Sequence, residues 1–332
     1  AGGLAGCGGG GGGSDGGGGG AATAPVAVQI TSANAKPVGA HASGTVQDST
    51  AVQTATSVAG VQVASGPTAA MPQPARVARV ALAMLRHAGS PAIAAGVVVD
   101  EAAACDNGGT VRISGNVASD NGLNPGDAVT LSASSCASSV NGQPVVMSGQ
   151  LTLAVTSGFL PQSGVGPFDV KLTITASDLS VSMGGASTVT SGDMALDWTE
   201  TTGSRLVVSG TTLSNSTTIA GSTRVTTLRN YLHSVEVVGT GFIGGLAATV
   251  ETSGSPLGSG ARSYAISTPP GLRWSASDAA PTAGVVQVVG AGNSQLRLTF
   301  SGASASLDVD ADGNGSFESS MPPDAAELKS LL

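Results

Sequence analysis

Short runs in which apolar and polar residues alternate fill most of the chain after Thr110, and Gly, Asn, Asp and Ser separate them. The clearest runs lie at Val129–Ala133, Leu151–Val155, Met194–Trp198 and Leu296–Phe300. A period of two places alternate side chains on one face, so each run predicts a strand with one buried face. Together the runs predict an all-β fold, a large curved antiparallel meander that forms an open, half-barrel or sandwich-like sheet.

One long strand is expected to be irregular. Within residues 170–183 the apolar positions change from even to odd numbers across Ser177 and Asp178. Because an extra residue exchanges the two faces of a strand, this change predicts a β-bulge or a break at that point.

Two segments have helical patterns. Val77, Val80, Ala81, Met84 and Ala88 recur at helical spacing, which predicts one helix near residues 75–88 that packs on the sheet. At the other end, Asp324–Glu327 precedes leucines and predicts a capping box that opens a short C-terminal helix.

Residue composition divides the chain into three parts. Residues 1–24 are dominated by glycine and predict a disordered tether, since glycine loses much entropy on ordering and buries nothing. Residues 25–74 have low complexity and no sustained period, so we expect a linker there. Residues 75–332 are expected to form the helix and β domain, with a sub-boundary near residue 268.

Charge and aromatic content exclude several classes of partner. The net charge of −8 removes the attraction that drives nucleic-acid binding and opposes docking on anionic lipid headgroups. Aromatic residues make up 3% of the chain, so stacking platforms for bases or sugars are scarce. No apolar run reaches the roughly 18 residues of a spanning helix.

The four residues Leu4-Ala5-Gly6-Cys7 stand directly before the glycine tract. They resemble the lipobox of bacterial lipoproteins, although the same letters can arise by chance in a sequence rich in glycine and alanine. The resemblance implies lipidation of Cys7 after removal of a signal peptide, and hence a membrane partner in the cell envelope. Gly8 rather than Asp follows the cysteine, which by analogy with the family favours the outer membrane.

Cys105 and Cys136 are the two other cysteines, and each lies beside a predicted strand. In an oxidising compartment we expect them to form a disulfide. A metal or catalytic role is the lesser alternative, because neither CxxC spacing nor a nearby histidine is present.

Turn-rich segments accompany these cysteines, at Cys105–Gly109, Asp120–Asp127, Asn141–Gly142 and Leu307–Glu318. They resemble a module of lipoproteins from Gram-negative bacteria, and the similarity is spread over most of Cys105 to Leu328. The resemblance implies a β-rich envelope protein and brings no known activity with it.

Acidic residues near the C-terminus resemble the start of a calcium loop. The candidate ligands of this weak calcium site are Asp308, Asp310, Asp312, Asn314 and Glu318. The twelfth position of such a loop should carry an acidic residue, but a count from Asp308 reaches Ser319 and a count from Asp310 reaches Met321. A plain Asp/Gly turn between two strands is the alternative.

Other motifs do not support catalysis. Gly239–Gly244 fits GxGxxG after a strand, but Pro256 follows too soon for the required helix, so we expect a glycine-rich hairpin turn. The three histidines, His41, His87 and His233, share no motif, and no nucleophile elbow, HExxH or P-loop occurs. We therefore expect no enzyme and no cofactor other than calcium.

Two hypotheses for function remain open. The first is a lipid-anchored, non-enzymatic envelope module that contacts another envelope protein or contributes to cell-surface structure. The second is a periplasmic carrier whose curved sheet holds a hydrophobic ligand, with the 75–88 helix as its plug. Neither hypothesis fixes the oligomeric state.

Overall fold

The computed structural model describes residues 24–50, 77, 81, 84, 97–119, 121–140, 143–161, 167–201, 203–254, 256–258, 260–269, 271–275, 281–302 and 304–322. These residues form one large sheet, a small second sheet, and the helix α1 (Ala35–Thr50). The strands of the first half are β1 (Val26–Ala27), β2 (Val97–Ala104), β3 (Thr110–Val117), β4 (Gly122–Leu123), β5 (Ala128–Val140), β6 (Gln143–Gly158), β7 (Leu160–Pro161), β8 (Phe168–Met183) and β9 (Ala186–Glu200). Those of the second half are β10 (Ser204–Ile219), β11 (Ser222–Val238), β12 (Gly241–Ser253), β13 (Arg262–Ser267), β14 (Leu272–Ser275), β15 (Ala283–Val289), β16 (Gln295–Ser301), β17 (Ser304–Asp310) and β18 (Ser319–Met321), with a short 3-10 helix, η2 (Ala291–Asn293), between β15 and β16.

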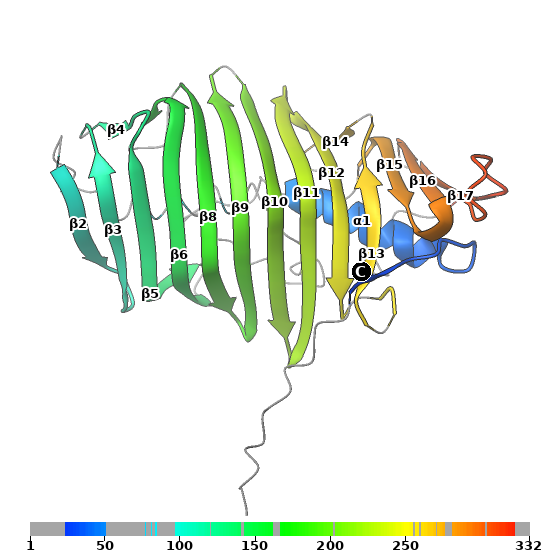
Figure 1. Cartoon of the computed structure of the whole chain (residues 1–332), viewed down its shortest axis with the longest axis horizontal. Helices are drawn as coiled ribbons and strands as arrows, with labels where there is room; N and C mark the ends of the chain where they lie inside the picture. Colours follow the sequence, from blue (N-terminus) through cyan, green and yellow to red (C-terminus); the bar gives the residue numbers. More distant parts are fainter. Residues whose placement is uncertain are drawn as a thin grey trace, which may run out of the picture.

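The large sheet is an antiparallel meander, as the alternation predicted. Its sixteen strands run from β18 at one edge to β2 at the other, and most neighbours in sequence are neighbours in the sheet. β1 pairs with β13 in parallel, β14 pairs with β12 and β15, and β4 and β7 form the small sheet. The sheet continues without a break across residue 268, because β13 pairs with both β12 and β15 (Figure 1).

A line of bulges crosses the middle of the sheet. The register shifts between Ala133 and Cys136 in β5, and again in β8, β10 and β11. In β8 the shift falls between Ala176 and Leu179, with Asp178 at φ +48°, so the predicted bulge is confirmed. We call this row the bulge line; such bulges bend a sheet and increase its twist.

Gly192 shows why the bulge line needs glycine. Its φ is +147°, and a Cβ at this position would lie 2.2 Å from the carbonyl oxygen of Thr212 on the bulged strand β10. Any larger residue would push the two strands apart at this point.

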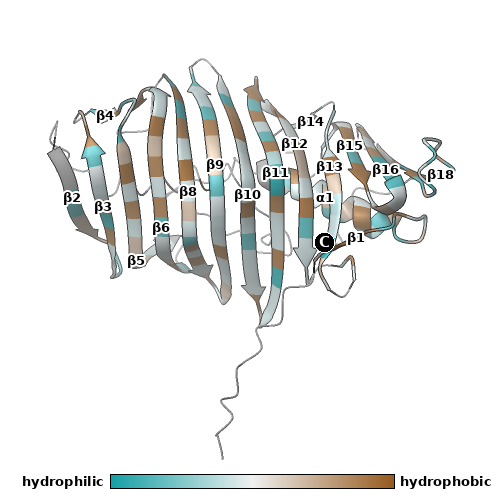
Figure 2. Ribbon diagram, in the orientation of Figure 1, coloured by the Kyte–Doolittle hydropathy of each residue, from teal (hydrophilic) through white to brown (hydrophobic). Residues whose placement is uncertain are grey.

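The sheet buries one face, and hydrophobic and hydrophilic residues alternate along its strands (Figure 2). Above the bulge line, in the orientation of Figure 1, the buried side chains of the central strands are mostly apolar. We call this set the upper inner face: Leu172, Ile174, Met194, Leu196, Leu206, Val208, Val235 and Leu246.

Below the bulge line most buried residues of β9 to β12 are polar, although Leu213, Leu228 and Val250 are buried there as well. We call these polar residues the lower inner face: Thr188, Thr190, Asn215, Thr217, Thr226 and Thr252. Its members lie on β9 to β12, and the register places Thr190, Asn215, Thr226 and Thr252 in one row across the four strands. Cross-strand bonds join Thr190 Oγ1 to Asn215 Oδ1 at 2.7 Å and the hydroxyls of Thr226 and Thr252 at 3.4 Å.

The helix α1 corrects the prediction that residues 25–74 form a linker. It contacts β11, β12, β15, β16 and β17 and lies on one side of the sheet (Figure 1). Val38, Ala40, Ala42 and Val46 are at most 1% exposed, and the whole run from residue 38 to 46 is buried. A helix buried on every side has no apolar stripe, and its small Ala, Gly, Ser and Thr residues resemble a linker in composition.

The helix predicted at residues 75–88 is described at three positions. Val77, Ala81 and Met84, all on the predicted apolar face, are helical and at most 4% exposed within the hydrophobic core. The predicted C-terminal helix begins at Asp324 and lies outside the described residues.

Candidate calcium site

The loop between β17 and β18 holds the candidate metal ligands. Asp310 is the last residue of β17, and the chain returns through β18, which pairs Met321 with Leu307. Gln29 Nε2 donates a hydrogen bond of 2.9 Å to the carbonyl of Ala311, so the loop is also joined to the segment ahead of α1.

Asp310 organises this loop from within. Its side chain is fully buried, and its Oδ1 accepts the N–H groups of Gly313 at 2.8 Å and Asn314 at 3.2 Å. Its Oδ2 accepts the N–H of Gly315 at 2.8 Å. Three backbone donors therefore satisfy a buried carboxylate that would otherwise be costly.

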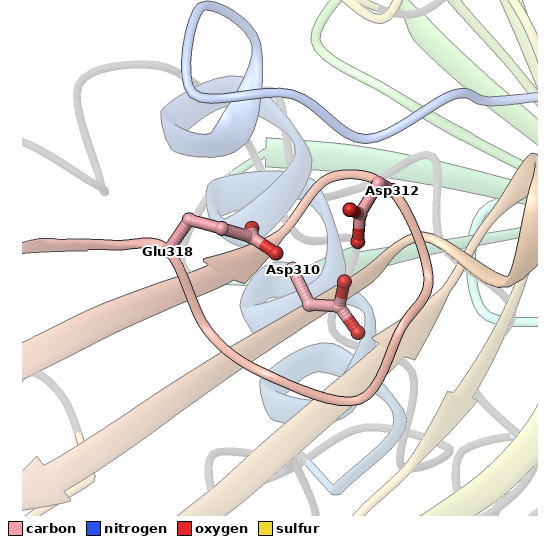
Figure 3. Close-up of side chains that lie close together, drawn as sticks. All are labelled: Asp310, Asp312 and Glu318. Carbon is pink, nitrogen blue, oxygen red and sulfur yellow. The ribbon is translucent and has the colours of Figure 1, made fainter.

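Asp312 and Glu318 complete an acidic cluster at the surface. One carboxylate oxygen from each of Asp310, Asp312 and Glu318 lies within 4.8 Å of the others (Figure 3). Glu318 Oε2 accepts the N–H of Ala311 at 3.0 Å, and Asp312 Oδ1 accepts that of Asn314 at 3.1 Å. A carboxylate offers about four lone-pair sites, so both exposed groups keep acceptor capacity for a cation beyond these bonds.

The spacing of these residues follows the first half of a calcium loop. Counted from Asp310, Asp312 is third, Asn314 is fifth and Glu318 is ninth, which are ligand positions of the twelve-residue loop. Gly315 is sixth, where the loop requires glycine for its sharp turn, and its φ is +89°. Carboxylate oxygens in this arrangement could hold a hard divalent cation, and Met321 at the twelfth position makes tight binding unfavourable.

The structure separates one member of the predicted ligand set, Asp308, from the others. Asp308 lies outside the cluster, because its Oδ2 accepts a hydrogen bond of 2.9 Å from Arg297 across β16. The side-chain amide of Asn314 donates to Asp312 Oδ2 at 2.9 Å, and its Oδ1 accepts the N–H of Ser316 at 2.7 Å. Asn314 thus also braces the loop beside Asp312, and the carboxylates of Asp310, Asp312 and Glu318 come together as predicted.

The predicted disulfide is present. Cys105 and Cys136 are bonded, with 5.4 Å between their Cα atoms, and join the turn after β2 to β5. Backbone bonds from Asn107 N to Ala137 O and from Ala137 N to Gly108 O hold the same turn against β5. Cys7 lies outside the described residues.

Two buried histidines have surroundings that no sequence motif indicated. His41 of α1 has Nδ1 at 2.7 Å from the hydroxyl of Tyr264, and its Nε2 has no partner. His233 on β11 is fully buried, and neither of its ring nitrogens has a partner. Burial lowers the pKa of each histidine to about 3, with a further contribution at His41 from Arg224. Both side chains are therefore neutral at pH 7.

Comparison with protein-family models, with curated proteins and with solved structures finds no match for this chain. Among the described residues, no helix has the length and apolar character needed to cross a membrane.

Proposed function

We propose that this protein is a lipid-anchored, non-enzymatic module of the bacterial cell envelope, held on the outer membrane through Cys7. The disulfide carries the proposal. The chain has three cysteines, and the bridge between Cys105 and Cys136 leaves Cys7 as the remaining thiol, directly before the glycine tract. Such a bridge is typical of proteins folded outside the cytoplasm, which is where a lipobox cysteine is modified.

The filled inner face supports an interaction or structural role. The side chains of the upper inner face are at most 5% exposed, so the folded chain itself covers the surface that a carrier would offer to its cargo. The opposite face carries exposed threonines such as Thr152 and the surface ion pair of Lys171 with Asp197, and also Leu232, which is 52% exposed. A protein partner in the envelope would meet this outer face or the ends of the sheet.

A carrier of a hydrophobic ligand is the second candidate, and His233 is the observation that favours it. An imidazole with two unpartnered nitrogens inside an apolar region could bond the polar head of a bound molecule. Solvent extraction and mass spectrometry of the purified native protein distinguish the two candidates. A stoichiometric co-purifying lipid would support the carrier, and its absence would support the envelope module.

The anchor is tested by Cys7→Ser in a precursor that carries a complete signal peptide. We expect the variant to leave the membrane fraction, because several acyl chains make anchoring effectively permanent while the described domain offers no spanning helix. Cys105→Ser/Cys136→Ser is the control: it replaces the two disulfide cysteines and should remain in the membrane fraction. Cys7→Ser protein that resists a high-salt wash of the membranes would contradict the proposal.

A further inference from the structure

Four asparagine–glycine pairs occur in the chain, and they begin at Asn107, Asn121, Asn141 and Asn314. Such a pair can rearrange without an enzyme, because the backbone nitrogen of the glycine can attack the side-chain carbonyl carbon of the asparagine. Glycine permits this attack best, since it has no Cβ to obstruct the closing ring. Asn141 lies outside the described residues, and the structure holds the reacting atoms of the other three pairs in different ways.

The pair at Asn314 is held by three hydrogen bonds. The side-chain nitrogen of Asn314 donates to Asp312 Oδ2 at 2.9 Å, and its Oδ1 accepts the N–H of Ser316 at 2.7 Å. The attacking atom would be the backbone nitrogen of Gly315, which donates to the buried carboxylate of Asp310 at 2.8 Å. All three bonds have to break before the ring can close.

The pair at Asn121 is enclosed by neighbouring chain. Gly122 is buried, and as the first residue of β4 it pairs with Pro161 of β7. The backbone N–H of Asn121 donates to Ser119 Oγ at 3.2 Å. Because water must hydrolyse the ring after it has closed, burial and strand pairing both oppose the reaction here.

The pair at Asn107 lies in the turn between β2 and β3, at one edge of the large sheet (Figure 1). Asn107 and Gly108 are both exposed, and the side-chain amide of Asn107 has no hydrogen-bond partner in the described part of the chain. A Cβ at Gly108 would meet no atom within 4 Å, so there is room for a closed ring. The attacking nitrogen, that of Gly108, is held by its hydrogen bond to the carbonyl of Cys105 at 3.1 Å.

We propose that Asn107 is a site of spontaneous deamidation in the folded protein, in which Asn121 and Asn314 are protected. The Gly108 nitrogen bonds to Cγ of Asn107, the bond from Cγ to the side-chain nitrogen breaks, and that nitrogen leaves as ammonia with the proton from Gly108. Water then opens the ring at one of its two carbonyl carbons. Attack at Cγ gives aspartate, and attack at the backbone carbonyl gives isoaspartate, whose main chain runs through the former side chain.

Isoaspartate at this position should loosen the turn from β5. The turn is joined to β5 by the disulfide of Cys105 with Cys136 and by two backbone hydrogen bonds. These bonds run from Asn107 N to Ala137 O at 2.9 Å and from Ala137 N to Gly108 O at 2.8 Å. The isomer inserts a methylene group into the main chain between them, so the two bonds cannot both keep their geometry. The disulfide would then be the link that still holds the turn at β5.

The test follows the full-length protein over time in neutral buffer, both folded and unfolded in guanidinium chloride. After reduction, cleavage behind Arg86 and Arg112 isolates Asn107 in a peptide that contains no other asparagine, and mass spectrometry measures its deamidation. Relative to the unfolded chain, folding should slow the reaction roughly fivefold at Asn107, where one hydrogen bond must break, and roughly 100-fold at Asn314, where three must break. Equal slowing at Asn107 and Asn314 would refute the proposal.

Asn107→Gln is the matched variant, because its longer side chain closes a ring far more slowly. The second readout is amide hydrogen exchange at Ala137. In the aged parent protein, the fraction that carries isoaspartate should exchange this N–H roughly fivefold faster, while the aged variant should keep the rate of fresh protein. Unchanged exchange at Ala137 in protein that carries isoaspartate would contradict the loosening of the turn.

Discussion

The upper and lower inner faces are buried to similar depth but are built from different side chains. Leu196 and Val208 above the bulge line are 3% and 0% exposed, and Thr226 and Thr252 below it are 0% and 2% exposed. Burial of an apolar side chain is favourable in itself, whereas a buried hydroxyl costs free energy unless it is hydrogen-bonded. The two halves of one sheet therefore stabilise the fold in different ways.

The lower inner face specifies register more strictly than the upper one. The pairs Thr188 with Thr217, Thr190 with Asn215, and Thr226 with Thr252 exist only when neighbouring strands align as observed. A shift of the register would leave several buried polar groups unpaired, each at about 1–3 kcal/mol. Above the bulge line, His233 breaks the pattern, since it is polar, buried and unpartnered.

Lowering the pH should have the largest effect on the free energy of unfolding, because it acts on buried histidines such as His233. The folded protein keeps His41 and His233 neutral down to a pKa of about 3, but both bind protons in the unfolded chain below about pH 6.5. The unfolded state thus binds more protons between pH 6.5 and 3, so stability falls as pH falls through this window. The loss approaches about 1.4 kcal/mol per pH unit for each histidine well below pH 6.5. Because each is only half protonated at pH 6.5 in the unfolded chain, both together should cost about 3 kcal/mol between pH 6.5 and 5. Denaturant unfolding at several pH values measures it.

His233→Leu should remove about half of that pH dependence, because only His41 then resists protonation. The slope is the readout, so a change in packing at the new leucine does not affect the conclusion. Equal slopes in the variant and the parent protein would show that His233 is protonated in the folded state.

Loss of apolar volume in the upper inner face should have the next largest effect. Leu196→Ala removes a 3% exposed side chain from the middle of the sheet and should reduce the free energy of unfolding by about 3 kcal/mol. Leu196→Met, which keeps the volume, should cost less than about 1.5 kcal/mol. Equal losses in the two variants would mean that packing at this position is not specific.

The sequence predicted the upper inner face better than the lower one. Alternation of apolar residues identified strands such as Leu151–Val155, and its change of phase located the bulge at Asp178. Polar residues such as Thr190 and Asn215 in an inner position have the same pattern as solvent-facing ones, so nothing local marks them as buried. Their partners lie on other strands, 25 residues apart in this pair.

The candidate site was predicted in part for a similar reason. The spacing of Asp310, Asp312 and Glu318 is local, so the sequence could bring them together. Asp308 fits the same spacing, but the register of β16 and β17 places it opposite Arg297. The local motif holds no information on that register. The helix α1 was missed because burial on all sides removes the amphipathic period.

Addition of calcium tests whether the acidic loop of Asp310, Asp312 and Glu318 is stabilised by its own hydrogen bonds alone, as the polar side chains of the lower inner face are, or also by a bound cation. If the acidic loop binds calcium with a dissociation constant of about 10⁻⁴ to 10⁻³ M, saturation at about 100 times that value should add about 2.7 kcal/mol to stability. Thermal unfolding with and without calcium measures the change. An unchanged Tm would show that hydrogen bonds within the loop suffice.

Two carboxylate variants show which residues bind. Asp312→Asn keeps an acceptor for the backbone N–H of Asn314, loses the one for its side-chain amide and removes a charge, so it should abolish most of the calcium effect. Asp308 pairs with Arg297 outside the cluster, so Asp308→Asn should leave the calcium effect unchanged. The reverse result would restore Asp308 to the ligand set.

The smallest change in the free energy of unfolding is expected for the pair Thr226 and Thr252. It tests most directly whether paired hydroxyl groups stabilise the lower inner face. Thr226→Val keeps the shape of the side chain but leaves the Thr252 hydroxyl, 2% exposed, without its partner. We expect a loss of about 1–2 kcal/mol in the free energy of unfolding. Thr226→Val/Thr252→Val replaces both hydroxyls with methyl groups of similar volume and should recover most of that loss, since no polar group is then left unpaired. Single losses that simply add in the double variant would mean that the hydroxyls are independent. The lower inner face would then owe its register to the backbone ladder and the bulges.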